Sequence, residues 1–556
     1  MTSLVELRIL EGPNLYFPRA AVKLTLDVSR LATATEADVR DFGVALGMTG
    51  VRPGSPDSGF RQRAVMRLAE RLVRRVAAGA GTTRLAVRVR PTSDPQQVVV
   101  AYPWRDRNRA HALAEAVATV LDEGVGALAG AVDAVASTVK GPGPTTLRPT
   151  VTVVAVTGTN GKTTTSRMIA HIARESGLHV GWSNTDGVYV DGVQVEAGDY
   201  SGPSGAGRVL AHPQVEFAVT ETARGGILLK GIGLASNDVS VVTNVTADHL
   251  GLHGIDTVDQ LAEVKGVVAR ITRKTGWAVL NADDPRVLAM RAITKAQHWI
   301  FTRDPDSPAI RDVLANGGRA TTVMDGWLTV LRPGRELDPM VEIVEVPMTL
   351  AGLSRFNVEN ALAAGSAALA AGLGRTDVID GLRSFLPDVE HNPGRMNFFT
   401  LDGFSVVIDL AHNEAGLEAL LEVMHGVVAP GCRVLLGLGV VGDRTDELIT
   451  DLAEIAAKGA DVVVVGHKQH YLRGRTVEEL DELMRAGASR VGVETLPSYP
   501  TELESLKVLA SLAEPGDVVG LMCHAERIDV LEWIAGAGGT PDTPVDLREK
   551  VRRARA

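Results

Sequence analysis

The stretch Thr157-Gly158-Thr159-Asn160-Gly161-Lys162-Thr163-Thr164-Thr165 decides how this chain is interpreted. The apolar residues 151–156 precede it, and apolar residues recur after it at intervals of three and four between residues 168 and 173. These flanks predict a buried strand before the stretch and an amphipathic helix after it. Strand, glycine-rich loop and helix, in that order, are typical of a loop that binds nucleotide phosphates.

The residue types within the loop suit phosphate. Gly158 and Gly161 allow backbone N–H groups to approach phosphate oxygens, and the following helix adds the positive end of its dipole. Lys162 is expected to reach the terminal phosphates, and the Thr163 hydroxyl is expected to bind magnesium. The predicted nucleotide-binding residues are therefore Gly158, Thr159, Asn160, Gly161, Lys162, Thr163 and Thr164.

Two qualifications apply to this loop. The usual pattern has a glycine where this chain has Val156, so the loop is a short variant, Gly-Thr-Asn-Gly-Lys-Thr. The alternative is a glycine-rich turn that binds nothing. The order of strand, loop and helix makes that alternative the weaker one.

Length and composition exclude several classes of protein. A chain of 556 residues is too long for a single core and predicts three or four domains. The net charge of −10 argues against a nucleic-acid-binding protein. No run of about 18 uncharged apolar residues is present, and Glu6 and Arg8 interrupt the segment where a signal peptide needs an apolar core. We therefore expect a cytoplasmic protein with neither a nucleic acid nor a membrane as partner.

Residues 1–142 form the first predicted domain, of the α+β class. Its signals are an amphipathic helix at residues 61–76, strands at 85–90 and 97–102, and an alanine-rich helix at 109–139. The stretch Gly141-Pro142-Gly143-Pro144 then breaks regular structure, which predicts a linker over residues 143–150.

Beyond the linker, strand-like runs alternate with helical ones, as in a parallel sheet covered by helices. The runs are residues 217–220, 239–245, 277–281, 405–410, 433–438 and 461–465. A break at residues 391–394 separates a central domain, residues 151–395, from a C-terminal domain, residues 396–556. The predicted class is α/β, with an α+β N-terminal domain, a central P-loop domain with a mainly parallel sheet, and a Rossmann-like C-terminal domain.

Polar residues follow the predicted strands of the central domain. Glu221 follows one strand, Asp248 and His249 follow the next, and Asn281 ends a third. Ligands of parallel sheets collect at the carboxyl ends of strands, where Glu221 suits magnesium and Asn281 suits adenine or ribose. Singly, each of these residues is more often a solvated loop residue or a helix cap. Together they favour a site for ATP and magnesium.

These segments resemble the Mur ligase superfamily. The resemblance rests on residues 158–165, 221–226, 243–249 and 281–285. Within the superfamily, the sequence is most similar to the Mur-type part of cyanophycin synthetases, over about residues 151–475. The further matching segments are residues 184–189, 201–203, 392–397 and 442–444. Residues 10–16 resemble, more weakly, the start of the same enzymes.

The resemblance implies ATP-dependent ligation in two steps. A substrate carboxylate attacks the γ-phosphate of ATP, and an amino acid or amine then displaces phosphate from the acyl phosphate. The catalytic residues that it implies are Lys162, Glu221, His249, Lys265 and Arg395. The magnesium ligands that it implies are Thr163, Glu221, His249 and Lys265. The further nucleotide contacts that it implies are Asn281, Arg395 and Asp409.

Lys265 falls where the family carries a carbamylated lysine, sixteen residues after His249. A carbamate turns a cation into an anion that helps to hold magnesium. The alternative is an exposed helical lysine. A departure from the family occurs near Asp409, where Leu410 and Glu414 replace a tyrosine and a proline. This departure predicts a pocket that recognises a different partner.

The resemblance to cyanophycin synthetases implies a comparison of domain order. Those enzymes consist of an N-terminal domain, an ATP-grasp ligase and a Mur-type ligase in series. Here the first domain leads through a short linker into the Mur-type loop, without room for an ATP-grasp unit. We therefore expect one ligase site, which makes a single amide bond or acts beside a separate partner ligase. A symmetric homo-oligomer is the default for a soluble enzyme of this size.

Two other functions stay open. One is an amidating ligase that takes ammonia from a glutaminase partner, although the cysteine cluster of that branch is absent here. The other is a non-catalytic nucleotide-binding scaffold or regulator of a partner ligase. A scaffold needs only the loop, and the joint retention of five residues argues against it: Lys162, Glu221, His249, Lys265 and Arg395.

Two further groups of residues are candidates for substrate contacts. An arginine run in the first domain is a candidate for binding an acidic acceptor, and the alternative is a solvated helix face. Its members are Arg61, Arg63, Arg67, Arg71, Arg74, Arg75, Arg84, Arg88 and Arg90. In the C-terminal domain, the candidates for binding a carboxylate-bearing amine are Lys468, Arg473 and Arg475. His524 and Glu526 are expected to face the same cleft.

Overall fold

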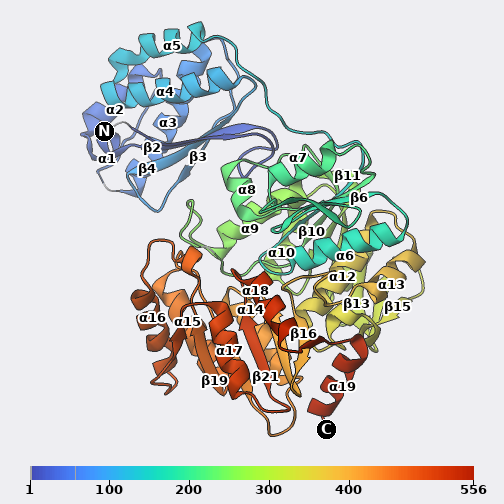
Figure 1. Cartoon of the computed structure of the whole chain (residues 1–556). Helices are drawn as coiled ribbons and strands as arrows, with labels where there is room; N and C mark the ends of the chain where they lie inside the picture. The colour runs from blue at the N-terminus through green and yellow to red at the C-terminus, as the bar shows by residue number, and fades with distance from the viewer. Residues whose placement is uncertain (1–2, 57, 249) are drawn as a thin grey trace.

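The computed structural model describes residues 3–56, 58–248 and 250–556. Three sheets, each from a different part of the chain, organise the molecule, and the C-terminal sheet lies at the opposite end from the N-terminal sheet (Figure 1). The predicted α/β class is confirmed. Within the described ranges, no helix is both long and apolar enough to cross a membrane.

The N-terminal sheet is antiparallel, with strand order β1-β2-β4-β3. Its strands are β1 (Leu4–Leu10), β2 (Ala21–Asp27), β3 (Arg88–Pro91) and β4 (Gln97–Pro103). Its helices are α1 (Ser29–Thr33), α2 (Glu36–Ala45), α3 (Gly59–Gly79), α4 (Arg107–Glu123), η1 (Val125–Ala127) and α5 (Leu128–Ser137). Leu24, Leu72 and Val117 are fully buried in the core that these elements share.

The prediction of one helix over residues 109–139 is wrong. The chain turns at Gly124, where φ is 89°, a conformation that side-chain-bearing residues rarely adopt. This turn ends α4 and lets α5 pack against both α4 and α3. An alanine-rich sequence has the same helical periodicity on either side of such a turn, so the pattern did not reveal the break.

The central sheet has eleven strands, in the order β15-β14-β13-β12-β11-β10-β5-β9-β6-β7-β8. The strands from β13 to β6 in this order pair in parallel, and antiparallel pairs flank them on both sides. Its strands are β5 (Thr152–Thr157), β6 (Val180–Ser183), β7 (Gly187–Val190), β8 (Val193–Ala197), β9 (Phe217–Glu221), β10 (Asn237–Val242), β11 (Thr272–Asn281), β12 (Gln297–Thr302), β13 (Arg319–Met324), β14 (Trp327–Leu331) and β15 (Asp338–Glu342).

Helices cover this sheet, and β5, which carries the loop, lies between β10 and β9. The ends of these three neighbouring strands therefore surround the loop. The helices are α6 (Lys162–Glu175), α7 (Pro203–Ala211), α8 (Arg224–Leu229), α9 (Val258–Arg270), α10 (Pro285–Ala289), η2 (Met290–Ala292), α11 (Pro308–Ala315), η3 (Ile343–Glu345), η4 (Pro347–Thr349), α12 (Arg355–Ala370) and α13 (Arg375–Ser384).

The C-terminal sheet has strand order β20-β19-β18-β21-β17-β16-β22, and its strands from β20 to β17 pair in parallel. Its strands are β16 (Asn397–Leu401), β17 (Phe404–Asp409), β18 (Val434–Leu438), β19 (Val462–Gly466), β20 (Ser498–Tyr499), β21 (Val518–Met522) and β22 (Thr540–Pro541). Its helices are α14 (Glu414–His425), α15 (Asp446–Gly459), η5 (Gln469–Tyr471), α16 (Val477–Ser489), α17 (Glu502–Leu512), α18 (Arg527–Gly536) and α19 (Pro544–Ala554).

The segment that follows β1 docks the N-terminal part on the central one. The Glu11 backbone N–H donates to the Lys230 carbonyl at 2.7 Å, and the Ile232 N–H donates to the Pro13 carbonyl at 2.7 Å. A Cβ atom on Gly12 would lie 1.8 Å from the Ile232 carbonyl oxygen. Only glycine allows the two backbones to approach so closely.

The predicted arginine run does not form one free basic face. Arg61 is 1% exposed, and its guanidinium donates to backbone carbonyls, among them that of Leu31 at 2.9 Å. Arg74 pairs with Glu70 on the same helix. Arg90 pairs with Glu263 of the central domain at 2.7 Å. These guanidiniums stabilise local structure and a domain contact.

Candidate active site

The predicted loop joins β5 to α6, in the order that the sequence indicated. Gly161 caps α6 with φ of 83°, and a Cβ atom there would lie 2.2 Å from Asn360 Oδ1. Only glycine fits this position without displacing Asn360. The backbone N–H groups at the start of α6 therefore lie at the end of a parallel strand, as anion binding requires.

The end of the neighbouring strand holds the loop in shape. β10 ends at Val242, three residues earlier than predicted, and the following residues contact the loop. Thr243 Oγ1 donates to the Asn160 carbonyl at 2.6 Å, and the Asn160 N–H donates to Asn244 Oδ1 at 2.9 Å. Thr159 is 1% exposed beneath them. The loop is therefore organised before any ligand binds.

Lys162 lies at the first position of α6 and is half-buried. Its Nζ donates to the carbonyl of Thr159, in its own loop, at 2.7 Å. An incoming phosphate oxygen would offer a charged acceptor in place of this neutral one.

Glu221 ends β9 and is 1% exposed. Its Oε2 accepts a hydrogen bond from Thr163 Oγ1 at 2.9 Å. Its Oε1 is buried and has no hydrogen-bond partner among the described residues. Burial raises the pKa of this carboxyl group, and the charge of Lys162 acts in the opposite direction. A buried carboxylate oxygen without a partner, beside the loop threonine, is suited to a cation.

Lys265 lies on α9 and is 3% exposed, so the alternative of an exposed helical lysine is wrong. Its Nζ donates to the carbonyl of Gly158 at 2.5 Å. Burial and then the charge of Lys162 lower the pKa of Lys265 to about 7. His249, the second predicted magnesium ligand, lies outside the described residues.

Arg395 and Asp409 lie beside the loop, where the central and C-terminal parts of the chain meet. Arg395 Nη2 donates to Thr163 Oγ1 at 3.5 Å. Asp409 ends β17, and its Oδ2 accepts from the Met396 N–H at 3.0 Å. Burial raises the pKa of Asp409 to about 6, although the charge of Arg395 lowers it. A cavity of about 80 Å³ lies between these residues, the loop and α12.

Two asparagines connect the loop directly to the C-terminal part. Asn160 Nδ2 donates to Asn413 Oδ1 at 3.3 Å, and Asn413 Nδ2 donates to Asn160 Oδ1 at 3.1 Å. Nearby, Arg444 Nη1 lies 3.1 Å from Asp248 Oδ1, in an ion pair that also crosses between the two parts.

Asn281 lies beside the site, but its side chain is occupied. Its Nδ2 donates to the Thr243 carbonyl at 2.8 Å and to Glu359 Oε2 at 3.2 Å, and its Oδ1 accepts from the Asp283 N–H. Sequence reasoning missed Glu359 and Asn360, both on α12. The available signal was a pair of asparagines, Asn357 and Asn360, spaced by three residues in an alanine-rich helix.

A buried charged cluster lies at the carboxyl ends of the C-terminal strands. Glu502 is 1% exposed and accepts backbone N–H groups of His524, Ala525 and Glu526 at 2.7, 2.9 and 2.9 Å. Lys468 Nζ lies 3.6 Å from Glu502 Oε1 and contacts His524 Nδ1. Burial opposes ionisation of Glu502, but its hydrogen bonds and Lys468 lower its pKa to about 2.

His524 is a neutral member of this cluster. Burial and then the charge of Lys468 lower its pKa to about 4, so its ring is neutral at pH 7. Its Nδ1 contacts Lys468 Nζ and lies 3.7 Å from Glu502 Oε1, and the tautomer in which Nδ1 accepts from the ammonium group carries its proton on Nε2. Nε2 is buried and has no hydrogen-bond partner in the described part of the chain. The ring lies 6.3 Å from that of His412, which lines the cavity beside the loop.

Family comparison agrees with this arrangement. Residues 156–368 match the Mur ligase middle domain, and residues 394–523 match the Mur ligase glutamate ligase domain. The chain belongs to the Mur ligase family, as its sequence motifs indicated.

The cyanophycin synthetase of Crocosphaera subtropica is 43% identical over 337 residues, which are 61% of this chain and 38% of that protein. The chain thus spans less than half the length of that relative. UDP-N-acetylmuramoyl-L-alanyl-D-glutamate–2,6-diaminopimelate ligase of Geobacillus kaustophilus is 29% identical over 388 residues, 66% of this chain and 72% of that protein. A structure of E. coli FolC in complex with DHPP and ADP has the same fold, with a TM-score of 0.52, 19% identity and coverage of 70% of this chain and 90% of that one.

Proposed function

We propose that this chain is an ATP-dependent amide ligase that activates a substrate carboxylate as an acyl phosphate and couples it to an amino acid or amine. The observation that carries the proposal is the unpartnered Glu221 Oε1 beside Thr163, where Lys162, Lys265 and Arg395 converge. The cations Lys162 and Arg395 and one buried carboxylate fit a nucleotide triphosphate with a metal ion.

Magnesium would be held by Thr163 and Glu221, with His249 and Lys265 as the further ligands that the family resemblance supplies. Bound there, the ion would neutralise charge on phosphate oxygens and polarise the transferred phosphoryl group. The chain's own contribution is a fixed carboxylate in a water-excluded site, where charge interactions are strong.

The reaction requires two displacements. An acceptor carboxylate oxygen attacks the γ-phosphorus of ATP, and the bond to the β-phosphate oxygen breaks to release ADP. The amine nitrogen then attacks the acyl carbon, inorganic phosphate leaves, and the amine loses a proton to phosphate or solvent. Lys162 and Arg395 would stabilise the charge that spreads over the transferred group.

Turnover would require the central and C-terminal parts to separate and close. The cavity of about 80 Å³ beside the loop is smaller than pockets that enclose ligands of nucleotide size, which are about 300–1,000 Å³. The adenosine part would therefore enter only when the Asn160–Asn413 contact opens. Closure around the bound nucleotide would then exclude water from the acyl phosphate.

The proposal is tested by ADP and phosphate release when the full chain is mixed with ATP, magnesium, and pooled amino acids and acidic peptides. Ligation predicts ADP release that needs both an acceptor and an amine, and a product whose mass identifies them. Release that ammonium alone supports would identify the amidating alternative. Tight nucleotide binding without release across the panel would identify a scaffold.

Lys265 gives a prediction about pH and carbon dioxide. Its pKa of about 7 leaves the amine neutral above that pH, and a neutral amine adds to carbon dioxide to form a carbamate with release of a proton. Activity in degassed buffer is therefore expected to rise on adding bicarbonate at pH 8, and much less at pH 6. Lys265→Met should abolish this response, and labelled bicarbonate should give a carbamate NMR signal in the wild type alone. An unmodified, fully active Lys265 would contradict the assignment.

His524 gives a prediction about the amine substrate. We assign its Nε2–H as a donor to a carboxylate oxygen of the incoming amino acid. Loss of a hydrogen bond to a charged group is worth about 1.5–3 kcal/mol, so His524→Ala should raise KM for the amine by about 10–100-fold. KM for ATP should change little, and His524→Gln should restore part of the affinity. Equal changes in both KM values would indicate a structural role instead.

A further inference from the structure

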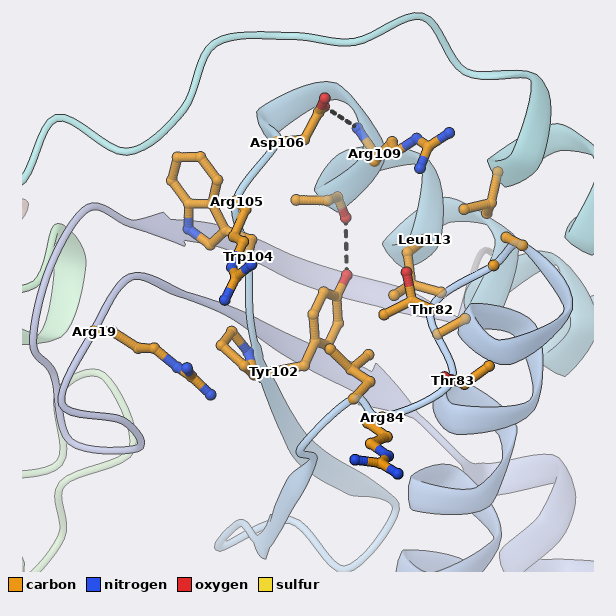
Figure 2. A pocket seen from close by; sticks show the side chains of 17 residues that line it. Arg19, Thr82, Thr83, Arg84, Tyr102, Trp104, Arg105, Asp106, Arg109 and Leu113 are labelled. Atoms are coloured by element: carbon orange, nitrogen blue, oxygen red, sulfur yellow. Dashed lines mark hydrogen bonds between the residues drawn. The ribbon is translucent and has the colours of Figure 1, made fainter.

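A cavity lies in the N-terminal part, away from the loop. Its volume is about 520 Å³, against about 80 Å³ for the cavity beside the loop. All of its lining residues fall between Arg19 and Val135, so none belongs to the central or C-terminal part. Figure 2 shows it around Tyr102, between the end of β4 and the start of α4.

Four arginines line this cavity: Arg19, Arg84, Arg105 and Arg109. They come from the loop after β1, the loop before β3, the β4–α4 junction and α4. None of the four guanidiniums has an ion pair or a hydrogen bond to the rest of the described chain. Arg109 Nε is buried without a hydrogen-bond partner among these residues. The cavity thus gathers positive charge from three segments of the N-terminal part, around Arg19, Arg84 and residues 105–109.

The single acid in the lining, Asp106, offsets one of the four positive charges, so the lining keeps a net positive charge. Asp106 caps α4 by accepting the Arg109 N–H at 3.0 Å, and it accepts the Gly141 N–H at 3.1 and 3.2 Å. Its carboxylate is occupied by backbone donors. Figure 2 shows Arg19, Arg84 and Arg105 grouped around Tyr102, with Arg109 on the first turn of α4.

The remaining wall is partly apolar, and Thr82 and Thr83 are its uncharged polar members. Tyr102 Oη donates to the Ala110 carbonyl at 2.8 Å, and Trp104 Nε1 donates to the Leu10 carbonyl at 3.1 Å. Their polar atoms are therefore used inside the protein, and the rings offer apolar surface together with Leu113 and Val135. A ligand that suits this site carries negative charge on a body that is partly apolar.

We propose that this cavity is a binding site for a compact anion that carries two or more carboxylate or phosphate groups. Guanidinium groups bind both kinds of oxyanion in pairs of parallel hydrogen bonds, and several arginines converge where such recognition is needed. The site is separate from the ligation site and does not depend on the proposed function.

The position of the cavity connects it to the rest of the molecule. Arg19 belongs to the loop that begins with Glu11, whose N–H contacts Lys230 of the central domain. Asp106 holds Gly141, at the start of the segment that leads to β5. A ligand on Arg19 and Arg105 would thus lie next to two of the segments that connect the N-terminal part to the nucleotide-binding part.

Calorimetric titration of the full chain at low salt tests the proposal, with citrate as carboxylate probe and pyrophosphate as phosphate probe. We expect saturable binding of at least one probe with one site per chain. The double variant Arg84→Ala/Arg109→Ala should weaken it by about tenfold or more, because it removes charge-assisted hydrogen bonds. Arg75→Ala, which removes an exposed arginine outside the cavity, is the matched control and should bind as the wild type does.

The outcomes are distinguishable. Binding of citrate alone assigns carboxylate recognition, and binding of pyrophosphate alone assigns phosphate recognition. Unchanged thermal unfolding of the double variant would show that its weaker binding is not a folding defect. If the double variant does not fold, the single variant Arg105→Ala tests the proposal in its place, and it should also weaken binding of the probe. Absence of saturable binding, or equal weakening by Arg75→Ala, would overturn the proposal.

Discussion

Replacing Lys162 with alanine is expected to lower kcat/KM for ATP-dependent ligation by about 10²–10³-fold, the usual loss for one preorganised charge-stabilising group. Lys162 starts α6 and donates only to the Thr159 carbonyl of its own loop. Removal of the Lys162 side chain therefore costs the free protein one local hydrogen bond. In the nucleotide complex, the same change would remove a positive charge that stabilises the triphosphate. Release of ADP in the presence of acceptor and amine measures the effect.

The matched control is Lys274→Ala, which removes an exposed lysine from β11 of the same domain. It should leave turnover unchanged. Thermal unfolding of the Lys162 variant without nucleotide should also match the wild type, because the side chain is half-buried and makes no ion pair within the described residues. Turnover that survives the Lys162→Ala change would place the chemistry away from this loop.

Glu221→Gln is expected to separate metal binding from stability. The amide keeps the shape of the side chain and an oxygen that can accept from Thr163, but it removes the negative charge. We expect turnover to fall by about 10²–10³-fold and magnesium to stabilise the nucleotide complex much less. Metal-dependent shifts in the unfolding temperature, measured with ADP, report the second effect.

Without metal, the same variant should be at least as stable as the wild type. Burial raises the pKa of Glu221, so the folded state binds its proton more tightly than the unfolded state does. The ionised carboxylate therefore costs stability as pH rises through its ordinary range, and a neutral amide avoids this cost. Glu216→Gln, at an exposed glutamate just before β9, is the control. A wild-type metal response in Glu221→Gln would contradict magnesium binding at this carboxylate.

The fold could be predicted where its signals are local. The loop between β5 and α6 is contiguous, and glycine, lysine and threonine each have a defined task in it. The parallel strands that follow are short apolar runs, and their predicted positions lie within a few residues of β9, β11 and β18. The break at Gly124 was missed because helical periodicity continues on both sides of it.

The candidate site was less predictable, because its chemistry depends on contacts between distant residues. The sequence placed Lys265 by spacing alone, but its burial results from packing of α9 beneath the loop. No sequence pattern identified Glu502 as a buried carboxylate, because its hydrogen-bond partners are backbone N–H groups that follow β21. The four cavity arginines lie at four separate positions, so no window of sequence contains them all.

The docking of Glu11 and Pro13 on the central domain also affects how the chain folds during synthesis. The N-terminal part can pair its four strands once residue 103, the end of β4, has left the ribosome. The partners of the docking segment, Lys230 and Ile232, are made only after the linker and about the first third of the central domain. Until then, these backbone groups depend on water for their hydrogen bonds. In a chain that starts after the linker, the Lys230 carbonyl and the Ile232 N–H would keep water as their hydrogen-bond partner. The first domain therefore supplies backbone partners that this surface of the central domain lacks on its own.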